Sequence, residues 1–233
     1  MKLDLHVHTN FGSSDSGLSP QDLVTAAKAV GLDGVCVTEH GTVWDTYQLE
    51  RFSAEHDFLV IPGMEVATDL GHITCFGLTG YSSGIHRAEI LRRVIQASDG
   101  IMIAAHPFRR LFDDPRINGW PKMYTLEEAA DLPIFKLTDE MEVVNGANNA
   151  QENLFALQVA RELGRIGVGG GDAHSTSGIG SGAIVTERHI SNVEEFIEEI
   201  REGRYYPTGA LLKGSDISYW DERAAELAAV GVR

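Results

Sequence analysis

The sequence has few cysteines, few basic residues and no long apolar run. Its 233 residues include two cysteines, Cys36 and Cys75, both inside apolar strand-like stretches. Two such cysteines exclude a disulfide framework and indicate a reduced compartment. Lys and Arg total 19 against 34 Asp and Glu, and the resulting net charge of -15 argues against a general nucleic-acid-binding surface. We expect a cytoplasmic protein with no membrane partner, since no apolar stretch is long enough to span a bilayer.

Two common catalytic motifs are also missing. The chain contains no Gly-x-Ser-x-Gly elbow, which argues against a serine nucleophile of the hydrolase type. It contains no Gly-x-x-x-x-Gly-Lys-Ser/Thr loop, and the run 169–171 of three glycines is too short and lacks the lysine. We interpret these glycines as a tight passage from a strand into a loop.

The sequence does contain histidines at strand-like positions. His6 and His8 lie two residues apart in an alternating polar and apolar run, so a strand would point both imidazoles to one face. Two converging imidazoles favour a divalent transition metal. These candidates begin at the very start of the chain, and we therefore expect no cleaved signal peptide, because cleavage would remove them.

Strand-like and helix-like segments alternate along the chain. Roughly seven such units predict an α/β fold with a mainly parallel sheet, closed or nearly closed into a barrel. The length fits one domain over residues 1–233. The stretch 109–138 is the least regular part and is interpreted as an inserted lid over the site, and the tail near 221–230 is predicted to form a last amphipathic helix.

Further His, Asp and Glu residues follow the last apolar residue of later strands, which is the rim where α/β barrels build active sites. The types suit zinc, manganese or iron, and a glutamate carboxylate can bridge two ions. Each member alone has an ordinary explanation: a hydrogen-bonded histidine, or an aspartate in a turn. The joint pattern predicts a metal site formed by His6, His8, Asp15, His40, Glu65, His72, His106, Asp172 and His174.

These residues occur in an ordered series of short motifs that resembles the PHP (polymerase and histidinol phosphatase) superfamily. The resemblance spans residue 3 to about residue 186. The motifs are Asp4-Leu5-His6-Val7-His8-Thr9, Ser14-Asp15, Thr38-Glu39-His40, Gly63-Met64-Glu65, His72, Ala105-His106-Pro107 and Gly171-Asp172-Ala173-His174.

The resemblance implies a distorted (β/α)7 barrel that holds three divalent transition metal ions. By the same resemblance, the ligands divide into three sets. The first ion is held by His6, His8, Glu65 and Asp172, the second by Glu65, His72 and His106, and the third by Asp15, His40 and His174.

One position departs from the family pattern. The family usually has Asp before the histidine of the second motif, and this chain has Glu39. That residue normally orients a ligand, so the metal site is expected to survive while the orienting hydrogen bond is in doubt. The alignment is weakest at His72, because the spacing after the bridging glutamate varies in the family.

Such a site predicts a phosphoric ester hydrolase in which a metal-activated water attacks phosphorus, with no other catalytic residue. The expected substrate is a small phosphomonoester or a nucleotide-type phosphodiester. Arg109 follows His106-Pro107 on the same rim and is a candidate phosphate contact, although a solvated loop arginine is an equal alternative.

Three alternatives stay open. A nuclease acting on oligonucleotide ends needs a path for the phosphate backbone, for which the chain offers few clustered basic or aromatic residues. A non-catalytic metal-binding module is a second. A carbonyl-directed metallohydrolase of the amidohydrolase type is a third, weakened because Lys136, in the irregular stretch, is a poor candidate for the strand-end lysine. The sequence does not indicate the oligomeric state.

Overall fold

The computed structural model describes residues 1–113 and 124–209. The helix expected near 221–230 lies outside these residues, and so does the middle of the stretch 109–138. Among the described residues, no helix has the length and apolar character needed to cross a membrane.

The described strands form one strongly curved sheet. Its order is β7-β6-β5-β4-β3-β2-β1-β8-β9. The strands are β1 (Lys2–Val7), β2 (Gly34–His40), β3 (Leu59–Thr68), β4 (Gly71–Phe76), β5 (Ile101–Ala104), β6 (Glu140–Asn145), β7 (Val168–Gly170), β8 (Ala183–Thr186) and β9 (Tyr205–Thr208).

The segment that follows β7 returns to the end of β1. Val7 and Ala173 form a parallel bridge, in which His8 N donates to Ala173 O at 2.9 Å and Ala173 N donates to His6 O at 3.2 Å. These hydrogen bonds connect the two distant parts of the sheet and produce a nearly closed, barrel-like arrangement. The barrel expected from the alternating pattern is therefore confirmed.

Half of the strand pairings are antiparallel, which the alternating pattern did not predict. β1 pairs with β2, β2 with β3, β5 with β6 and β6 with β7 in parallel, whereas β4 runs antiparallel to both β3 and β5, and β8 runs antiparallel to β1 and β9. The β3–β4 hairpin matters for the site. Because β4 runs the opposite way, its first residues lie at the same rim as the last residues of the parallel strands.

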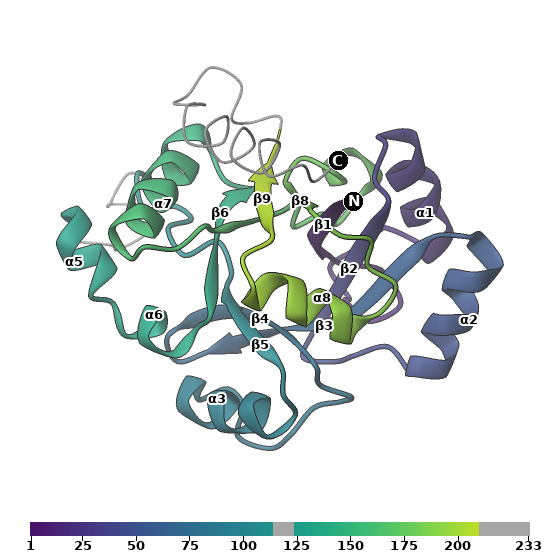
Figure 1. The fold of residues 1–233 in the computed structure, drawn as a ribbon, viewed down its shortest axis with the longest axis horizontal. Helices are drawn as coiled ribbons and strands as arrows, with labels where there is room; N and C mark the ends of the chain where they lie inside the picture. The colour runs from purple at the N-terminus through teal and green to yellow at the C-terminus, as the bar shows by residue number, and fades with distance from the viewer. Residues whose placement is uncertain (114–123, 210–233) are drawn as a thin grey trace.

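The helices lie around the strands, with α1 and α2 on one side and α5, α6 and α7 on the other (Figure 1). Ser19 caps α1 by accepting a hydrogen bond from Asp22 N at 3.1 Å, and Pro20 begins the helix, as the sequence predicted. The helices are α1 (Pro20–Ala29), α2 (Thr46–His56), α3 (Ala88–Ala97), α5 (Leu126–Ala130), α6 (Pro133–Leu137), α7 (Ala150–Glu162) and α8 (Val193–Arg201), with a 3-10 turn η1 (Thr176–Gly178).

Strand β1 shows how the core positions the site. Leu3 and Leu5 are buried in an apolar cluster that includes Phe76 and residues of α8. The alternate residues His6 and, just beyond the strand, His8 are also fully buried. Burying imidazoles inside a barrel is costly unless they have partners, and the partners define the candidate site.

Candidate metal centre

All nine ligands expected from the sequence meet at one rim of the barrel. His40 ends β2, His72 is the second residue of β4, and His106 follows β5. Glu65 lies within β3, not after it, because β3 continues to Thr68 to pair with β4. The side chain of each of the nine residues lies within 4 Å of the side chain of at least one other.

Glu65 lies at the centre, buried, and its two oxygens face different histidines. Oε1 lies 2.8 Å from His72 Nδ1 and 3.1 Å from His106 Nε2. Oε2 lies 3.0 Å from His40 Nδ1 and 3.4 Å from His8 Nε2. A carboxylate with ligand atoms on both sides is the arrangement a bridging ligand requires.

Four ligand atoms surround one point beside Glu65 Oε2. His6 Nε2 and His8 Nε2 are 3.0 Å apart, and each lies 3.4–3.6 Å from Glu65 Oε2 and from Asp172 Oδ1. Tetrahedral ligands about 2.1 Å from a zinc ion are about 3.4 Å from one another. The observed spacing therefore fits a four-coordinate ion, and the donor types suit a borderline transition metal.

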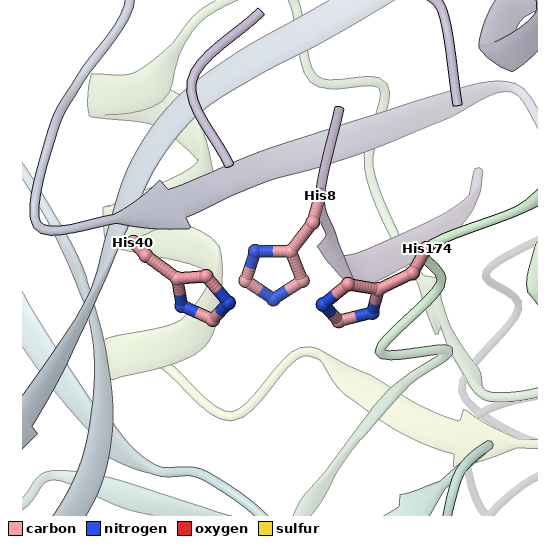
Figure 2. Close-up of side chains that lie close together, drawn as sticks. All are labelled: His8, His40 and His174. Atoms are coloured by element: carbon pink, nitrogen blue, oxygen red, sulfur yellow. The ribbon is translucent and has the colours of Figure 1, made fainter. Parts of the chain in front are cut away.

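A second group lies on the outer side of His8. The His8 ring lies between those of His40 and His174, with ring centroids 4.2 and 4.4 Å away (Figure 2). Asp15 Oδ2 lies 3.1 Å from His40 Nε2 and 3.4 Å from His174 Nε2. One ligand atom from each of the three histidines falls within 4.8 Å of the others, which is close enough for a common ion.

His6 is oriented by a carboxylate that the sequence reasoning did not identify. His6 Nδ1 donates to Glu142 Oε1 at 2.7 Å, and both side chains are buried. Glu142 is held in turn by His106 N and by Asn145 Nδ2, each at 2.7 Å. A proton fixed on Nδ1 leaves the Nε2 lone pair directed at the cluster.

His8 is oriented through a hydroxyl. Ser13 Oγ donates to Glu39 Oε2 at 2.5 Å, so it accepts from His8 Nδ1 at 3.2 Å. Glu39 also accepts hydrogen bonds from Thr9 and, at 2.9 Å, from Trp44 Nε1. Glu39, the residue that departs from the family's usual Asp, therefore still orients a candidate ligand: it positions His8 through Ser13.

The electrostatics of the cluster favour a cation. Burial lowers the pKa of His6, but Glu142, Asp172 and Glu65 outweigh it and raise that pKa well above its usual range. Burial lowers the pKa of His8, which keeps this ring neutral. Two ring nitrogens 3.0 Å apart need a proton or a metal ion between them, and an ion would displace that proton.

The carboxylates of the cluster stay ionised. Burial opposes the charge of Glu65, yet His6 and hydrogen bonds from His106 and His40 hold its pKa well below the usual range. The pKa of Asp172 is lowered in the same way, against burial, by the charges of His6 and Arg109. Ionised carboxylates and a neutral His8 are the forms that bind metal.

Asp4 joins strand β1 to the segment after β7, behind the cluster. Its carboxylate accepts hydrogen bonds from Gly171 N at 2.7 Å and Gly180 N at 2.9 Å, as well as from His6 N at 3.1 Å. Complete burial raises its pKa to about 7, despite these bonds. Asp4 thereby fixes the loop that carries Asp172 against the strand that carries His6.

Arg109 lies at the edge of the cluster. Its Nη2 contacts Asp172 Oδ2 and donates to Asn145 Oδ1 at 2.8 Å, and its Nε donates to Asn148 Oδ1 at 3.1 Å. The guanidinium is therefore fixed beside the ligands, and is not a freely solvated loop arginine. Asn145 contacts both neighbours: its Oδ1 accepts from Arg109 and its Nδ2 donates to Glu142.

Comparisons with known proteins bear on the family and on the fold. A family model described as PHP-associated matches residues 150–205. The uncharacterized protein MJ1587 of Methanocaldococcus jannaschii is 28% identical over 118 residues, which is 46% of this chain and 68% of that protein.

Several solved structures share the fold. A proposed metal-dependent phosphoesterase of Bifidobacterium adolescentis superposes with a TM-score of 0.53 at 18% identity, covering 74% of this chain and 87% of that one. The lesion-specific endonuclease EndoQ of Pyrococcus furiosus has a TM-score of 0.53 at 17% identity, covering 88% of this chain and 57% of that one.

Proposed function

Because this chain carries a domain of the PHP superfamily, we propose that it is a metal-dependent phosphoric ester hydrolase acting on a small phosphate ester. The observation that carries the proposal is Glu65, whose two oxygens face ligand atoms on opposite sides. This arrangement suits adjacent ions that contact one phosphoryl group.

We assign the ligands to three ions. The set of His6, His8, Glu65 and Asp172 holds the first, Glu65 with His72 and His106 the second, and Asp15 with His40 and His174 the third. When bound, such ions supply Lewis-acid charge and lower the pKa of water enough to provide hydroxide at neutral pH.

The protein's own groups position the reactants. Arg109 presents its planar guanidinium next to Asp172, where it can donate to a phosphoryl oxygen while Asn145 and Asn148 hold it in place. Glu142 and Ser13 fix the imidazoles of His6 and His8, so the ligands need little rearrangement during the reaction.

The cysteines do not offer a competing nucleophile. Cys36 and Cys75 are completely buried, and burial raises the pKa of both thiols above the usual range. A thiolate is therefore not available at neutral pH. This supports water as the attacking group.

A nuclease acting on oligonucleotide ends is the second candidate. The likeness in fold to a lesion-specific endonuclease is the observation in its favour. The net charge of -15 opposes it, because a nucleic-acid backbone is bound chiefly through basic residues.

One experiment separates these candidates. The purified protein would be stripped of metal, reloaded with manganese, zinc or iron, and assayed on a phosphomonoester, a phosphodiester and a short oligonucleotide. The proposal predicts metal-dependent hydrolysis of at least one small ester. Oligonucleotide cleavage that falls steeply with salt would favour the nuclease, and full metal occupancy without hydrolysis would favour a non-catalytic module.

A further inference from the structure

A pocket of about 480 Å3 opens beside the cluster, on the side of His72 and His106. This volume lies within the range of about 300–1,000 Å3 that is usual for small-ligand sites. The two histidines line the pocket and also contact Glu65, so the pocket is continuous with the proposed metal centre. Arg109 lines it as well.

Four separate segments build the described part of the pocket. They are the β3–β4 turn with the start of β4, the segment after β5, the position of Tyr124 before α5, and the start of α6. Gly71, the first residue of β4, has a φ of 121°. A Cβ added there would lie 3.5 Å from Cδ1 of Ile134, which also lines the pocket. A glycine at this place both allows the backbone conformation and leaves the space open.

The walls divide into a charged end and an apolar end. Among the described lining residues, His72, His106 and Arg109 form the charged end beside the cluster, whereas Leu70, Phe108, Leu111, Leu132 and Ile134 contribute apolar surface. Two further polar side chains line the pocket: Tyr124, and Asp69, whose carboxylate accepts a hydrogen bond from Ala88 N at 2.8 Å. Phe108 and Ile134 are buried, and the three leucines are half-buried beside them. A ligand that fills both ends must be anionic at one end and apolar at the other.

We propose that this pocket is the subsite for the apolar group of an alkyl or aryl phosphate ester. This inference rests on the proposed function: the phosphoryl group lies at the cluster and Arg109, and the alcohol portion enters the apolar end. A sugar or polyol would bury hydroxyls against leucine and phenylalanine, where they would lose hydrogen bonds to water without replacement. The pocket therefore selects for hydrocarbon.

A series of n-alkyl phosphates tests the proposal, because ethyl, butyl and hexyl esters share nearly the same leaving-group chemistry and differ in apolar area. We expect kcat/KM to rise by up to about fourfold for each methylene that enters the pocket, the factor corresponding to complete burial. Hexylphosphonate, which is not hydrolysed, should inhibit more strongly than ethylphosphonate. Its binding should show a negative heat-capacity change in calorimetry.

A charge placed in the pocket provides the matched comparison. Leu111→Asp introduces a carboxylate beside the hydrocarbon and should flatten the dependence on chain length, and Leu111→Ala should weaken it without adding charge. Leu126→Asp is the control, because Leu126 is exposed in the first turn of α5, where an acidic residue is well tolerated. The control should keep the wild-type dependence on chain length.

The outcomes distinguish the two proposals. Metal-dependent hydrolysis of all esters at equal efficiency, or equal chain-length dependence in Leu111→Asp and wild type, would overturn the apolar subsite and leave the hydrolase standing. Failure to hydrolyse any ester after metal loading would overturn the hydrolase, and this inference with it. A steep chain-length dependence that Leu111→Asp removes would establish the subsite.

Discussion

His6 Nδ1 lies 2.7 Å from Glu142 Oε1, and neither side chain is accessible to solvent. The two residues are separated by 136 positions in the chain and come from strands β1 and β6. Buried carboxylates that accept from a ligand histidine fix its tautomer and increase its basicity. The pair therefore sets the direction from which His6 approaches an ion.

We predict that Glu142→Gln weakens metal binding by about 10–100-fold, the usual effect of losing a group that orients a ligand. The amide keeps the size of the side chain but presents a neutral group to His6 Nδ1 and to His106 N. Competition with a chelator would measure the affinity. Glu162→Gln on the exposed surface of α7 is the control, and equal affinity in both variants would contradict an orienting role.

Ser13→Ala should weaken metal binding by about tenfold, at the lower end of such effects. The alanine removes the oxygen that accepts from His8 Nδ1 and leaves one buried oxygen of Glu39 with fewer donors. The measurement is again metal affinity, with the exposed Ser175→Ala as the control. Ser13→Thr, which keeps a hydroxyl, should restore part of the loss. Wild-type affinity in Ser13→Ala would show that His8 is oriented by other contacts.

Arg109→Lys should lower kcat/KM by about tenfold or more, because an ammonium group cannot reproduce the planar, bidentate contacts of a guanidinium. Asn145 and Asn148 hold the guanidinium of Arg109 at two separate nitrogens, and a lysine can satisfy only part of this arrangement. Metal content should stay near the wild-type value, since Arg109 is not among the ligands. Loss of metal together with activity would instead make Arg109 a structural partner of Asp172.

The pH dependence of stability can be tested away from the metal centre, at Glu199. This carboxylate is inaccessible and accepts from Arg188 Nε at 2.8 Å and Arg204 Nε at 2.9 Å. Burial opposes its charge, but hydrogen bonds from both arginines hold the pKa below its usual value of 4.5. A lowered folded-state pKa stabilises the protein above the unfolded-state value, and this stabilisation is lost as the pH falls through the folded-state value.

Glu199→Gln should therefore reduce the free energy of unfolding at pH 7 by about 1.5–3 kcal/mol, the range for hydrogen bonds to charged groups. The difference between wild type and variant should shrink as the pH falls below 4.5. Urea titrations of both proteins at pH 7 and at pH 3.5 would measure it. A difference of equal size at the two pH values would contradict the assignment of this stabilisation to the ionised carboxylate.

The periodic parts of the fold could be predicted from sequence, and the strand directions could not. Ser19 and Pro20 mark the start of α1 by chemistry that acts within one turn. The extension of β3 to Thr68 depends instead on pairing with β4, a contact between strands that no local pattern encodes. For the same reason the sequence placed Glu65 after a strand, whereas it lies inside one.

The ligand candidates could be proposed from sequence because most of them lie close to a strand end in a recognisable motif. The residues that orient them could not, because they act across the fold. Glu142 did leave a signal: it is an acidic residue between Met141 and Val143 within an apolar strand, which is costly without a buried partner. Ser13 left none, since a serine in a polar loop has many ordinary explanations.

The most direct test of this account is the metal content of the purified, metal-loaded protein by elemental analysis, together with its ester hydrolysis, in wild type and Glu65→Gln. We predict two to three transition metal ions per wild-type chain and metal-dependent turnover. Glu65→Gln should lose at least one ion and nearly all turnover, because both oxygens of Glu65 face ligand histidines. A wild-type protein that binds no metal under any loading condition, or that hydrolyses esters fully without it, would contradict the account.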